Sequence, residues 1–326
     1  MMKDHIVIDS EARTNPSFGC RPSQRGIDEL LDCGIILVNK PPGPTSHQLA
    51  AWARDILGLK RIGHGGTLDP FATGVLTLLC GRATKITEIL LSKSKSYTAV
   101  LRFKTPVEAK DLSNLLDRLT TEIYNVPPKE SAVKVQVRSR KIKSATHLDV
   151  DESKRIHVIS VDCNAGTYIR TLSKDIGLLI GVGCELLELH RQGSGLFDDT
   201  MCCTMHQLMD SVFLWNEHGD EAGLSKIIAP VESVLDELPK IFVKDGAVSA
   251  VSHGAPLARP GLVSIPRDLS RGDIAVISSL KGEAVAISKI LFDSQSIIEM
   301  SSGQVATLST VLMPQGSYPQ TWGKTN

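Results

Sequence analysis

Residues 62–74 of the 326-residue chain read IGHGGTLDPFATG. The glycines in this stretch allow positive φ values and the close approach of another chain, and Pro70 restricts Asp69 to extended conformations. A carboxylate held on a rigid turn beside open backbone suits a nucleophile or a general base. An Asx-type turn, in which Asp69 bonds only its own backbone, is the alternative. The residues alone leave both interpretations open.

The segments on either side of this stretch predict a mixture of strands and helices. Thr45 and Gln48 have the spacing of a capping box, and the apolar residues that follow predict a helix that ends near Gly58. Alternating apolar residues predict a half-buried strand at 97–103. Further strands are expected at 35–38, 74–79 and 156–163, and helices at 112–119 and 167–180. Because strands and helices do not alternate strictly, the pattern indicates an α+β fold with a mixed, largely antiparallel sheet.

The length of the chain favours two domains. Residues 217–237 hold six acids against one lysine, and this acidic stretch separates a second unit. Short strands divided by Gly and Pro follow it, which predicts a small β-barrel or sandwich; they are expected at 241–243, 261–265, 273–278 and 284–289. We therefore expect an N-terminal extension at 1–34, which could pack on the C-terminal domain, a larger domain at 35–230 and a small domain at 239–316.

Composition excludes several classes of protein. The chain is 42% hydrophobic and 22% charged, as is ordinary for a globular protein. Its apolar runs are far shorter than the roughly 18–20 residues that cross a bilayer, and the N-terminus lacks the apolar core of a signal peptide, so we expect a cytoplasmic protein without membrane attachment. Seven cysteines without a CxxC pair and nine histidines without HExxH predict no metal site. The glycines fit neither GxxxxGK[ST] nor GxGxxG, which argues against a nucleotide-phosphate site.

Charge is balanced over the whole chain but not locally. Thirty-six basic and thirty-six acidic residues cancel, so net charge gives no support for nucleic-acid binding. Residues 129–143 nevertheless hold one acid, Glu130, against six basic side chains: Lys129, Lys134, Arg138, Arg140, Lys141 and Lys143. Screening limits the reach of each charge to roughly 8–10 Å, so such a basic stripe can bind phosphates locally. A solvated charged strand is the alternative.

Four motifs in this order resemble the TruB/dyskerin family of pseudouridine synthases. They are ILVNKPPGPTSH (36–47), GHGGTLDPFATG (63–74), SKSYTAV (94–100) and GTYIRTL (166–172). Downstream, LPKIFVKDGAVSAVSHGAPLARPGLV (238–263) and KGEAVAISKIL (281–291) resemble the PUA RNA-binding domain. The resemblance covers roughly residues 20–316 and is closest to the archaeal and eukaryotic branch, which also carries PP-x-x-SAVK.

This resemblance implies a fold and an activity. The fold is a catalytic domain with a largely antiparallel sheet, followed by a small β-barrel PUA domain. The activity is isomerisation of uridine to pseudouridine in structured RNA, either rRNA through an H/ACA guide RNA or tRNA uridine 55 in the TΨC loop. The implied partners are therefore tRNA, rRNA, H/ACA guide RNA and the small accessory proteins of the H/ACA particle. The reaction breaks the N1–C1′ bond and rejoins the ring through C5 without a redox change, so no cofactor is implied.

The resemblance also assigns roles to residues of the site. The matching aspartate, Asp69, acts at C1′ of a flipped uridine, where the transition state has positive character as in glycoside cleavage. Arg170 pairs with this carboxylate, and Tyr97 stacks on the flipped uracil and assists proton removal. Substrate contacts are implied for His64, Tyr168 and Lys40, and RNA contacts for Lys129, Lys134, Arg138, Arg140, Lys141, Arg191, Gly254 and Ala255.

The sequence departs from the family at two places. The archaeal branch has ELRRTRSG where this chain has ELHRQGSG (188–195), so His190 and Gly193 replace two arginines and put RNA contacts there in doubt. A His-Gly-Asp-type turn is also missing after the strand that carries Tyr97. Two other functions compete with the isomerase: a non-catalytic RNA-binding scaffold built on a PUA module, and a glycosidase of free nucleosides, which is weakened because no second carboxylate motif is recognisable.

Overall fold

The computed structural model describes residues 4–127 and 136–320, so Lys129 and Lys134 lie outside the described residues. The chain divides into two compact units. The central unit consists of residues 36–79 and 87–227, and the terminal unit consists of residues 1–35, 80–86 and 228–326. The N-terminal segment thus belongs to the same unit as the C-terminal part of the chain, while the domain limits expected from the sequence stay a prediction.

The central unit contains most of the motif residues. Its strands are β2 (Gly34–Lys40), β3 (Ile62–His64), β4 (Thr73–Cys80), β5 (Lys95–Phe103), β6 (Glu122–Asn125), β7 (Arg138–Val150), β8 (Ile156–Cys163), β9 (Cys184–Ser194) and β10 (Phe197–Asp198). Its helices are α2 (Ser46–Ile56), α3 (Thr87–Leu91), α4 (Ala109–Leu119), α5 (Ile169–Ile180), α6 (Met205–His218) and α7 (Ala222–Ile227). Every strand and helix predicted for this region is present.

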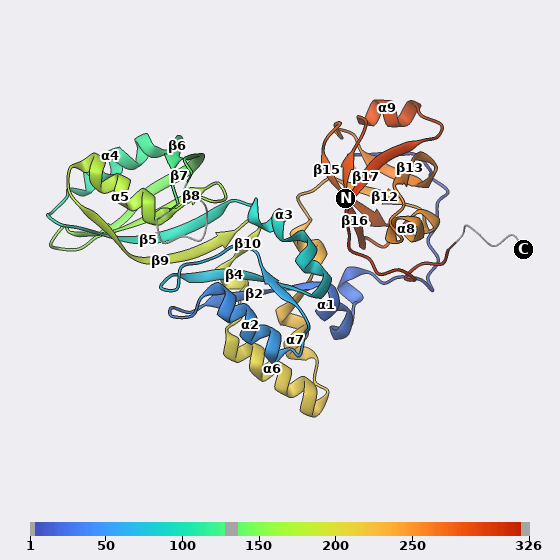
Figure 1. Ribbon diagram of the computed structural model, residues 1–326, viewed down its shortest axis with the longest axis horizontal. Helices are drawn as coiled ribbons and strands as arrows, with labels where there is room; N and C mark the ends of the chain where they lie inside the picture. Colours follow the sequence, from blue (N-terminus) through green and yellow to red (C-terminus); the bar gives the residue numbers. More distant parts are fainter. Residues whose placement is uncertain (1–3, 128–135, 321–326) are drawn as a thin grey trace, which may run out of the picture. The chain divides into compact units, whose positions relative to one another are not determined.

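The sheet of the central unit runs in the order β2-β4-β9-β5-β8-β7-β6. The pairs β5–β9, β5–β8, β7–β8 and β6–β7 are antiparallel, whereas β4 pairs with β9 in parallel. Helices α4 and α5 pack against this sheet (Figure 1). The prediction of a mixed, largely antiparallel α+β fold is confirmed.

The core of the central unit follows from side-chain alternation on β5. Alternate residues from Lys95 to Phe103 are buried, as expected for a strand with one face on the core. The apolar residues of this face join those of β8, α4 and α5 in one cluster, which also contains Leu68 and Ala72 beside the motif aspartate. Helix α2 begins at the predicted capping box, in which Thr45 accepts from the backbone N–H of Gln48. The motif segment therefore packs against the apolar core of the central unit.

The terminal unit has its own sheet, in the order β1-β14-β12-β15-β16-β17-β13. The strands are β1 (His5–Val7), β11 (Ile228–Pro230), β12 (Lys240–Val243), β13 (Leu257–Ala258), β14 (Leu262–Pro266), β15 (Ile274–Ser279), β16 (Ala284–Ile290) and β17 (Gln304–Val311). Its helices are α1 (Ile27–Cys33), α8 (Asp245–Ser252) and α9 (Ser294–Glu299). The four strands predicted here correspond to β12, β14, β15 and β16, which pack around an apolar cluster.

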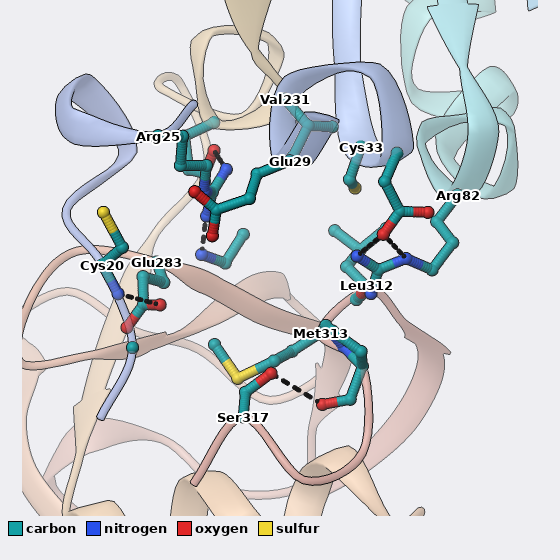
Figure 2. A pocket seen from close by; sticks show the side chains of 15 residues that line it. Cys20, Arg25, Glu29, Cys33, Arg82, Val231, Glu283, Leu312, Met313 and Ser317 are labelled. Carbon is teal, nitrogen blue, oxygen red and sulfur yellow. Dashed lines mark hydrogen bonds and ion pairs between the residues drawn. The ribbon is translucent and has the colours of Figure 1, made fainter. Parts of the chain in front are cut away.

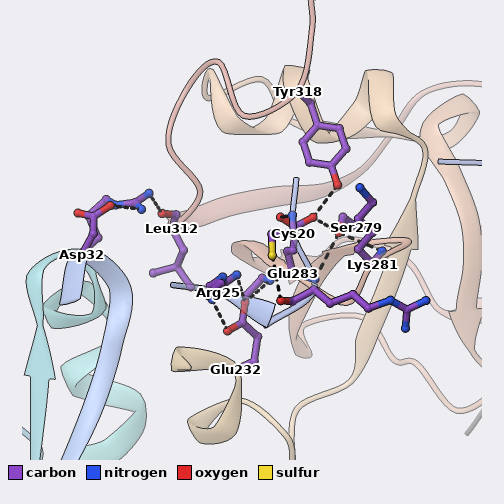
Figure 3. A network of polar contacts seen from close by, with 12 residues as sticks. Cys20, Arg25, Asp32, Glu232, Ser279, Lys281, Glu283, Leu312 and Tyr318 are labelled. Atoms are coloured by element: carbon purple, nitrogen blue, oxygen red, sulfur yellow. Dashed lines mark hydrogen bonds and ion pairs between the residues drawn. The ribbon is translucent and has the colours of Figure 1, made fainter. Parts of the chain in front are cut away.

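The N-terminal segment is tied to the C-terminal strands by polar contacts. Glu283, which is 5% exposed, accepts hydrogen bonds from the Cys20 N–H at 3.0 Å, from Ser279 at 2.6 Å and from the Tyr318 hydroxyl at 2.5 Å (Figure 3). Arg25 and Glu232 form a bidentate ion pair with both N···O distances at 2.8 Å. Strand β1 also pairs with β14. These contacts, which fix the segment in place, explain why residues 1–35 belong to this unit.

A pocket of about 320 Å³ lies beside this network (Figure 2). Two arginines that line it form ion pairs inside the unit: Arg82 bonds Asp32 and also the Leu312 carbonyl, and Arg25 bonds Glu232. A buried ion pair costs desolvation energy and is retained only with good geometry. The pocket is thus walled by structural ion pairs.

Several elements of the fold, α8 and β17 among them, were absent from the sequence prediction. The long strand β9 and helix α6 were not expected, although β9 is the strand that joins β4 to β5. Among the described residues, no helix combines the length and the apolar character that a membrane span requires.

Candidate active site

The motif aspartate lies on a loop, residues 65–72, that joins β3 to β4 and is named here the catalytic loop. The loop is held from several sides by hydrogen bonds. The Leu68 N–H donates to the Ser46 hydroxyl at 2.9 Å, and the Gly43 N–H donates to the Pro70 carbonyl at 2.8 Å. The Ala72 N–H closes a turn on the Asp69 carbonyl at 3.0 Å. A turn fixed in this way presents its carboxylate in one orientation, as a reacting group requires.

Lys40 holds the catalytic loop from inside the protein. Its side chain is 0% exposed, and its ammonium donates to the carbonyls of Pro41 and Pro70, both at 2.9 Å, and of Ala72 at 2.8 Å. These three acceptors use all three donors of the group. The predicted substrate contact of Lys40 is therefore incompatible with this geometry, because the ammonium is enclosed and fully bonded.

Replacing Lys40 by Met should destabilise the protein and impair the site together. The change leaves three carbonyl groups without their donor, and the expected loss in free energy of unfolding is about 3 kcal/mol. Denaturant unfolding of both proteins measures this loss. Lys60→Met, at an exposed position after α2, is the matched control and should change stability by less than about 0.5 kcal/mol. Equal stabilities of Lys40→Met and the original chain would contradict the anchoring role.

Asp69 and Arg170 meet at the centre of the site. Their side chains form an ion pair with an N···O distance of 2.7 Å and are 38% and 27% exposed. The Arg170 guanidinium also lies over the ring of Phe71, 5.6 Å from its centroid, which is a cation–π contact. The carboxylate is therefore oriented by a paired cation yet open to solvent on one side, which leaves room for a substrate.

The start of α5 positions Arg170. Tyr168 precedes the helix, and its backbone N–H donates to Asn125 at 2.8 Å while its carbonyl accepts from the same side chain at 3.3 Å. Asn125, at the end of β6, is 1% exposed, so its buried side-chain amide holds the backbone of Tyr168 in place. The Thr171 hydroxyl donates to the Val126 carbonyl at 2.8 Å. These bonds fix the first turn of α5 beside the catalytic loop.

Tyr97 lies under the same site on β5. The residue is 8% exposed and belongs to the apolar cluster that includes Leu68. Burial raises the pKa of the Tyr97 phenol, and the positive charge of Arg191 opposes this rise. Asp69 lies close enough to act on the same phenol electrostatically. The structure thus brings together the three residues for which the sequence predicted a catalytic role.

His64 lies at the end of β3, just before the catalytic loop. Its ring meets that of His47 edge-on, with centroids 4.6 Å apart, and its Nδ1 is buried without a hydrogen-bond partner. Burial, followed by repulsion from His47 and Arg191, lowers the pKa of His64 from 6.5 to about 4. The imidazole is neutral at physiological pH and has an unused polar atom, which suits a residue that meets an uncharged base.

The low pKa of His64 predicts a pH effect on stability. In the unfolded chain this imidazole takes up a proton below about pH 6.5, whereas in the folded chain it does so only near pH 4. Lowering the pH through this window therefore favours unfolding. We expect the original chain to lose more thermal stability than His64→Gln between about pH 7.5 and about pH 5. Melting temperatures of both proteins at both pH values test this, and a pH-independent difference between them would refute it.

Five of the residues predicted to contact RNA lie in two groups. Arg138 and Lys141 are exposed on β7, and Arg140 beside them packs its guanidinium against Gly166. Gly254 and Ala255, in the terminal unit, follow α8; Gly254 is exposed with φ at 96°. These positions are accessible to a large ligand.

Arg191 does not fit the predicted RNA contact. The side chain is 2% exposed and donates through Nε to the Val75 carbonyl at 2.7 Å and through Nη2 to the Gly66 carbonyl at 3.1 Å. A guanidinium enclosed in this way cannot reach a phosphate at the surface. His190, the neighbouring residue that departs from the family motif, is hydrogen-bonded to Thr73 at 2.8 Å and to Asp199 at 3.0 Å. Its imidazole therefore connects these two side chains.

Sequence reasoning missed several residues that build the site. Phe71 could have been noticed, because it directly follows Asp69 and Pro70 and lies on the same turn as the carboxylate. Ser46 and Asn125 gave no signal, since a serine at a helix start and an asparagine at a strand end are common in any fold. Their roles depend on partners that are distant in the sequence.

Comparisons with known proteins agree with this geometry. Residues 54–169 match the TruB family pseudouridylate synthase N-terminal domain, and residues 170–236 match the tRNA pseudouridylate synthase B C-terminal domain. Residues 239–312 match the PUA domain and residues 1–50 the DKCLD domain. A relative from Pyrobaculum calidifontis, named "Probable tRNA pseudouridine synthase B", is 39% identical over 317 residues, which are 97% of this chain and 95% of that protein. The chain belongs to the TruB family of pseudouridylate synthases.

Other TruB family members are similarly close. A protein of the same name from Methanosarcina acetivorans is 41% identical over 98% of this chain and 94% of its own length. A structure named "Crystal structure of the archaeal box H/ACA sRNP Nop10-Cbf5 complex" superposes with a TM-score of 0.89 at 39% identity, covering 98% of both chains. Another, "Structure of H/ACA RNP bound to a substrate RNA containing 2'-deoxyuridine", gives 0.90 at 37% identity, covering 98% of this chain and 97% of that one. Membership of the TruB family supports an isomerase over a non-catalytic scaffold.

Proposed function

We propose that this TruB family enzyme isomerises uridine to pseudouridine in folded RNA with Asp69 as the catalytic carboxylate. The observation that carries the assignment is the ion pair of Asp69 with Arg170 at 2.7 Å, on a loop that is open to solvent on one side. Breaking the N1–C1′ bond leaves positive character at C1′, which a fixed carboxylate stabilises or captures. The Arg170 pairing holds the carboxylate in one rotamer.

Tyr97, Tyr168 and His64 complete the proposed site. The phenol of Tyr97 lies in the same apolar cluster as Leu68 of the catalytic loop, where it can stack on the uracil ring. Tyr168 directly precedes the helix of Arg170 and lines the site. His64 occupies the gap that the flipped base leaves in its RNA. Extruding a base costs a few kcal/mol of stacking, so these contacts offset part of that cost.

We further propose the RNA and protein partners. The relatives named above are tRNA pseudouridine synthases B, and the structural neighbours are components of H/ACA particles with Nop10, Gar1 and substrate RNA. By analogy this chain modifies tRNA uridine 55, or rRNA through an H/ACA guide RNA, together with small accessory proteins in the cytoplasm. Exposed Arg138 and Lys141, with Arg140 between them, would follow the RNA backbone, and Gly254 and Ala255 would contact RNA from the PUA domain.

Nucleoside analysis of treated RNA tests the activity and the choice of substrate. The full chain is incubated with a tRNA TΨC stem-loop, and separately with a target RNA plus an H/ACA guide RNA, and both are digested and separated by chromatography. Pseudouridine in either reaction supports the isomerase, and its dependence on the guide RNA decides between the substrates. RNA binding without pseudouridine in both reactions, also after addition of accessory proteins, would support the scaffold instead. Release of free uracil would indicate a glycosidase.

A further inference from the structure

Arg191 occupies an unusual place at the centre of the sheet. It lies on β9 between two neighbours, with Tyr97 as its partner on β5 and Gly74 as its partner on β4. A Cβ on Gly74, whose φ is 100°, would lie 2.2 Å from the Arg191 carbonyl oxygen, so only glycine allows the two strands to approach this closely. The Arg191 side chain is therefore enclosed between the strand that carries Tyr97 and the strand that follows the catalytic loop.

The guanidinium of Arg191 is a buried charge that donates to neutral carbonyl groups. Its hydrogen-bond acceptors are the carbonyls of Val75 and Gly66. Across the part of the chain that the structure describes, no carboxylate forms an ion pair with it. A buried guanidinium without a counter-charge is costly, and its bonds to the two carbonyls offset only part of that cost.

The same guanidinium acts on the phenol of Tyr97. Tyr97 is the cross-strand partner of Arg191, and the charge of Arg191 opposes the rise that burial causes in the pKa of Tyr97. The planar fork of a guanidinium offers five donors, enough to bond two carbonyls and still face a phenol. Lys95, buried nearby, directs its ammonium to the carbonyls of Leu90 at 3.1 Å and Lys93 at 2.7 Å.

We propose that Arg191 is a positioning residue of the isomerase, which links the phenol of Tyr97 to the Gly66 carbonyl of the catalytic loop and so fixes the distance between Tyr97 and Asp69. The residue touches no substrate, because it is enclosed beneath the site. It acts through Tyr97, whose orientation and charge distribution it sets. This inference rests on the proposed role of the site in uridine isomerisation.

A double-mutant cycle separates this role from a purely structural one. Single-turnover rates and KM are measured for the full-length original chain, Arg191→Met, Tyr97→Phe and the double variant. We expect Arg191→Met to lower the rate by roughly 30- to 100-fold with KM within about threefold, and to lower it by less than about threefold when Tyr97 is already Phe. Arg191→Lys, which restores the charge without the fork, should recover part of the rate. The same loss in both backgrounds would overturn the proposal.

A spectroscopic measurement covers the case in which Tyr97→Phe has no measurable rate. The chain contains four tyrosines, so labelling with 3-fluorotyrosine gives a simple fluorine NMR spectrum, in which Tyr97→Phe identifies the Tyr97 line. We expect Arg191→Met to shift this line and Arg191→Lys to shift it less, while the line of Tyr124, which is 80% exposed, stays in place. An unmoved Tyr97 line would overturn the proposal. This measurement needs no RNA, so it tests the contact between Arg191 and Tyr97 even if the original chain forms no pseudouridine.

Discussion

Asp69→Asn is expected to abolish pseudouridine formation while RNA binding persists. The amide keeps the size and most of the shape of the carboxylate but carries no negative charge, so it neither stabilises a positive C1′ nor bonds to it. We expect the rate to fall by roughly four orders of magnitude or more, as for removal of other catalytic nucleophiles. RNA affinity should change by less than about threefold, because phosphate contacts supply most of it. Nucleoside analysis after single-turnover incubation and a filter-binding titration measure the two quantities.

Asp117→Asn is the matched control for this experiment. The residue lies on α4 in the same unit and is exposed, so the same chemical change there should alter neither quantity. The melting temperatures of both variants show whether each remains folded. A variant at position 69 that still forms product at an appreciable fraction of the original rate would show that another group performs the reaction.

Much of the fold could be predicted because local patterns agree with it. The alternation on β5 and the capping box of α2 depend on neighbours within a few residues, and both are confirmed. Strand β9 was missed because it runs between two other strands of the sheet, where its sequence ELLELHRQGS shows neither clean alternation nor an apolar run. Central strands take their stability from both neighbours, which a single segment does not reveal.

The site could be predicted only in part for a related reason. The motifs gave Asp69, Tyr97 and Arg170, and the structure brings these together, since the ion pair and the shared electrostatics connect them. Lys40 and Arg191 were assigned to substrate and RNA because they match positions of the family motifs, and a motif does not show whether a side chain is buried. Their burial follows from carbonyl groups of the catalytic loop that are distant in sequence. A residue's type indicates its charge, whereas its partners decide whether that charge faces the ligand or the protein.

Arg170→Met is expected to give the second largest loss of activity. Methionine keeps much of the length and the contact with Phe71 but leaves Asp69 without the cation that lies 2.7 Å away. The Asp69 carboxylate can then adopt several rotamers, so it lies in the position that reacts with C1′ of the bound uridine for a smaller fraction of the time. We expect kcat to fall by roughly 100- to 1,000-fold with KM nearly unchanged, because the interaction acts mainly in the transition state. Stability should fall by only about 1 kcal/mol or less, since the pair is partly exposed.

Arg170→Lys and Lys174→Met make this prediction specific. Lysine retains the charge but has neither the fork that binds a carboxylate nor the planar face that stacks on Phe71, so its rate should lie between those of Arg170→Met and the original chain. Lys174 is exposed one turn further along α5, and its replacement by Met should leave kcat within about twofold. Full activity of Arg170→Met would mean that the loop alone orients Asp69, through its bonds to Ser46 and Lys40. In that case the guanidinium would have no role in orienting Asp69, and the hydrogen bonds of the catalytic loop alone would hold the carboxylate in place.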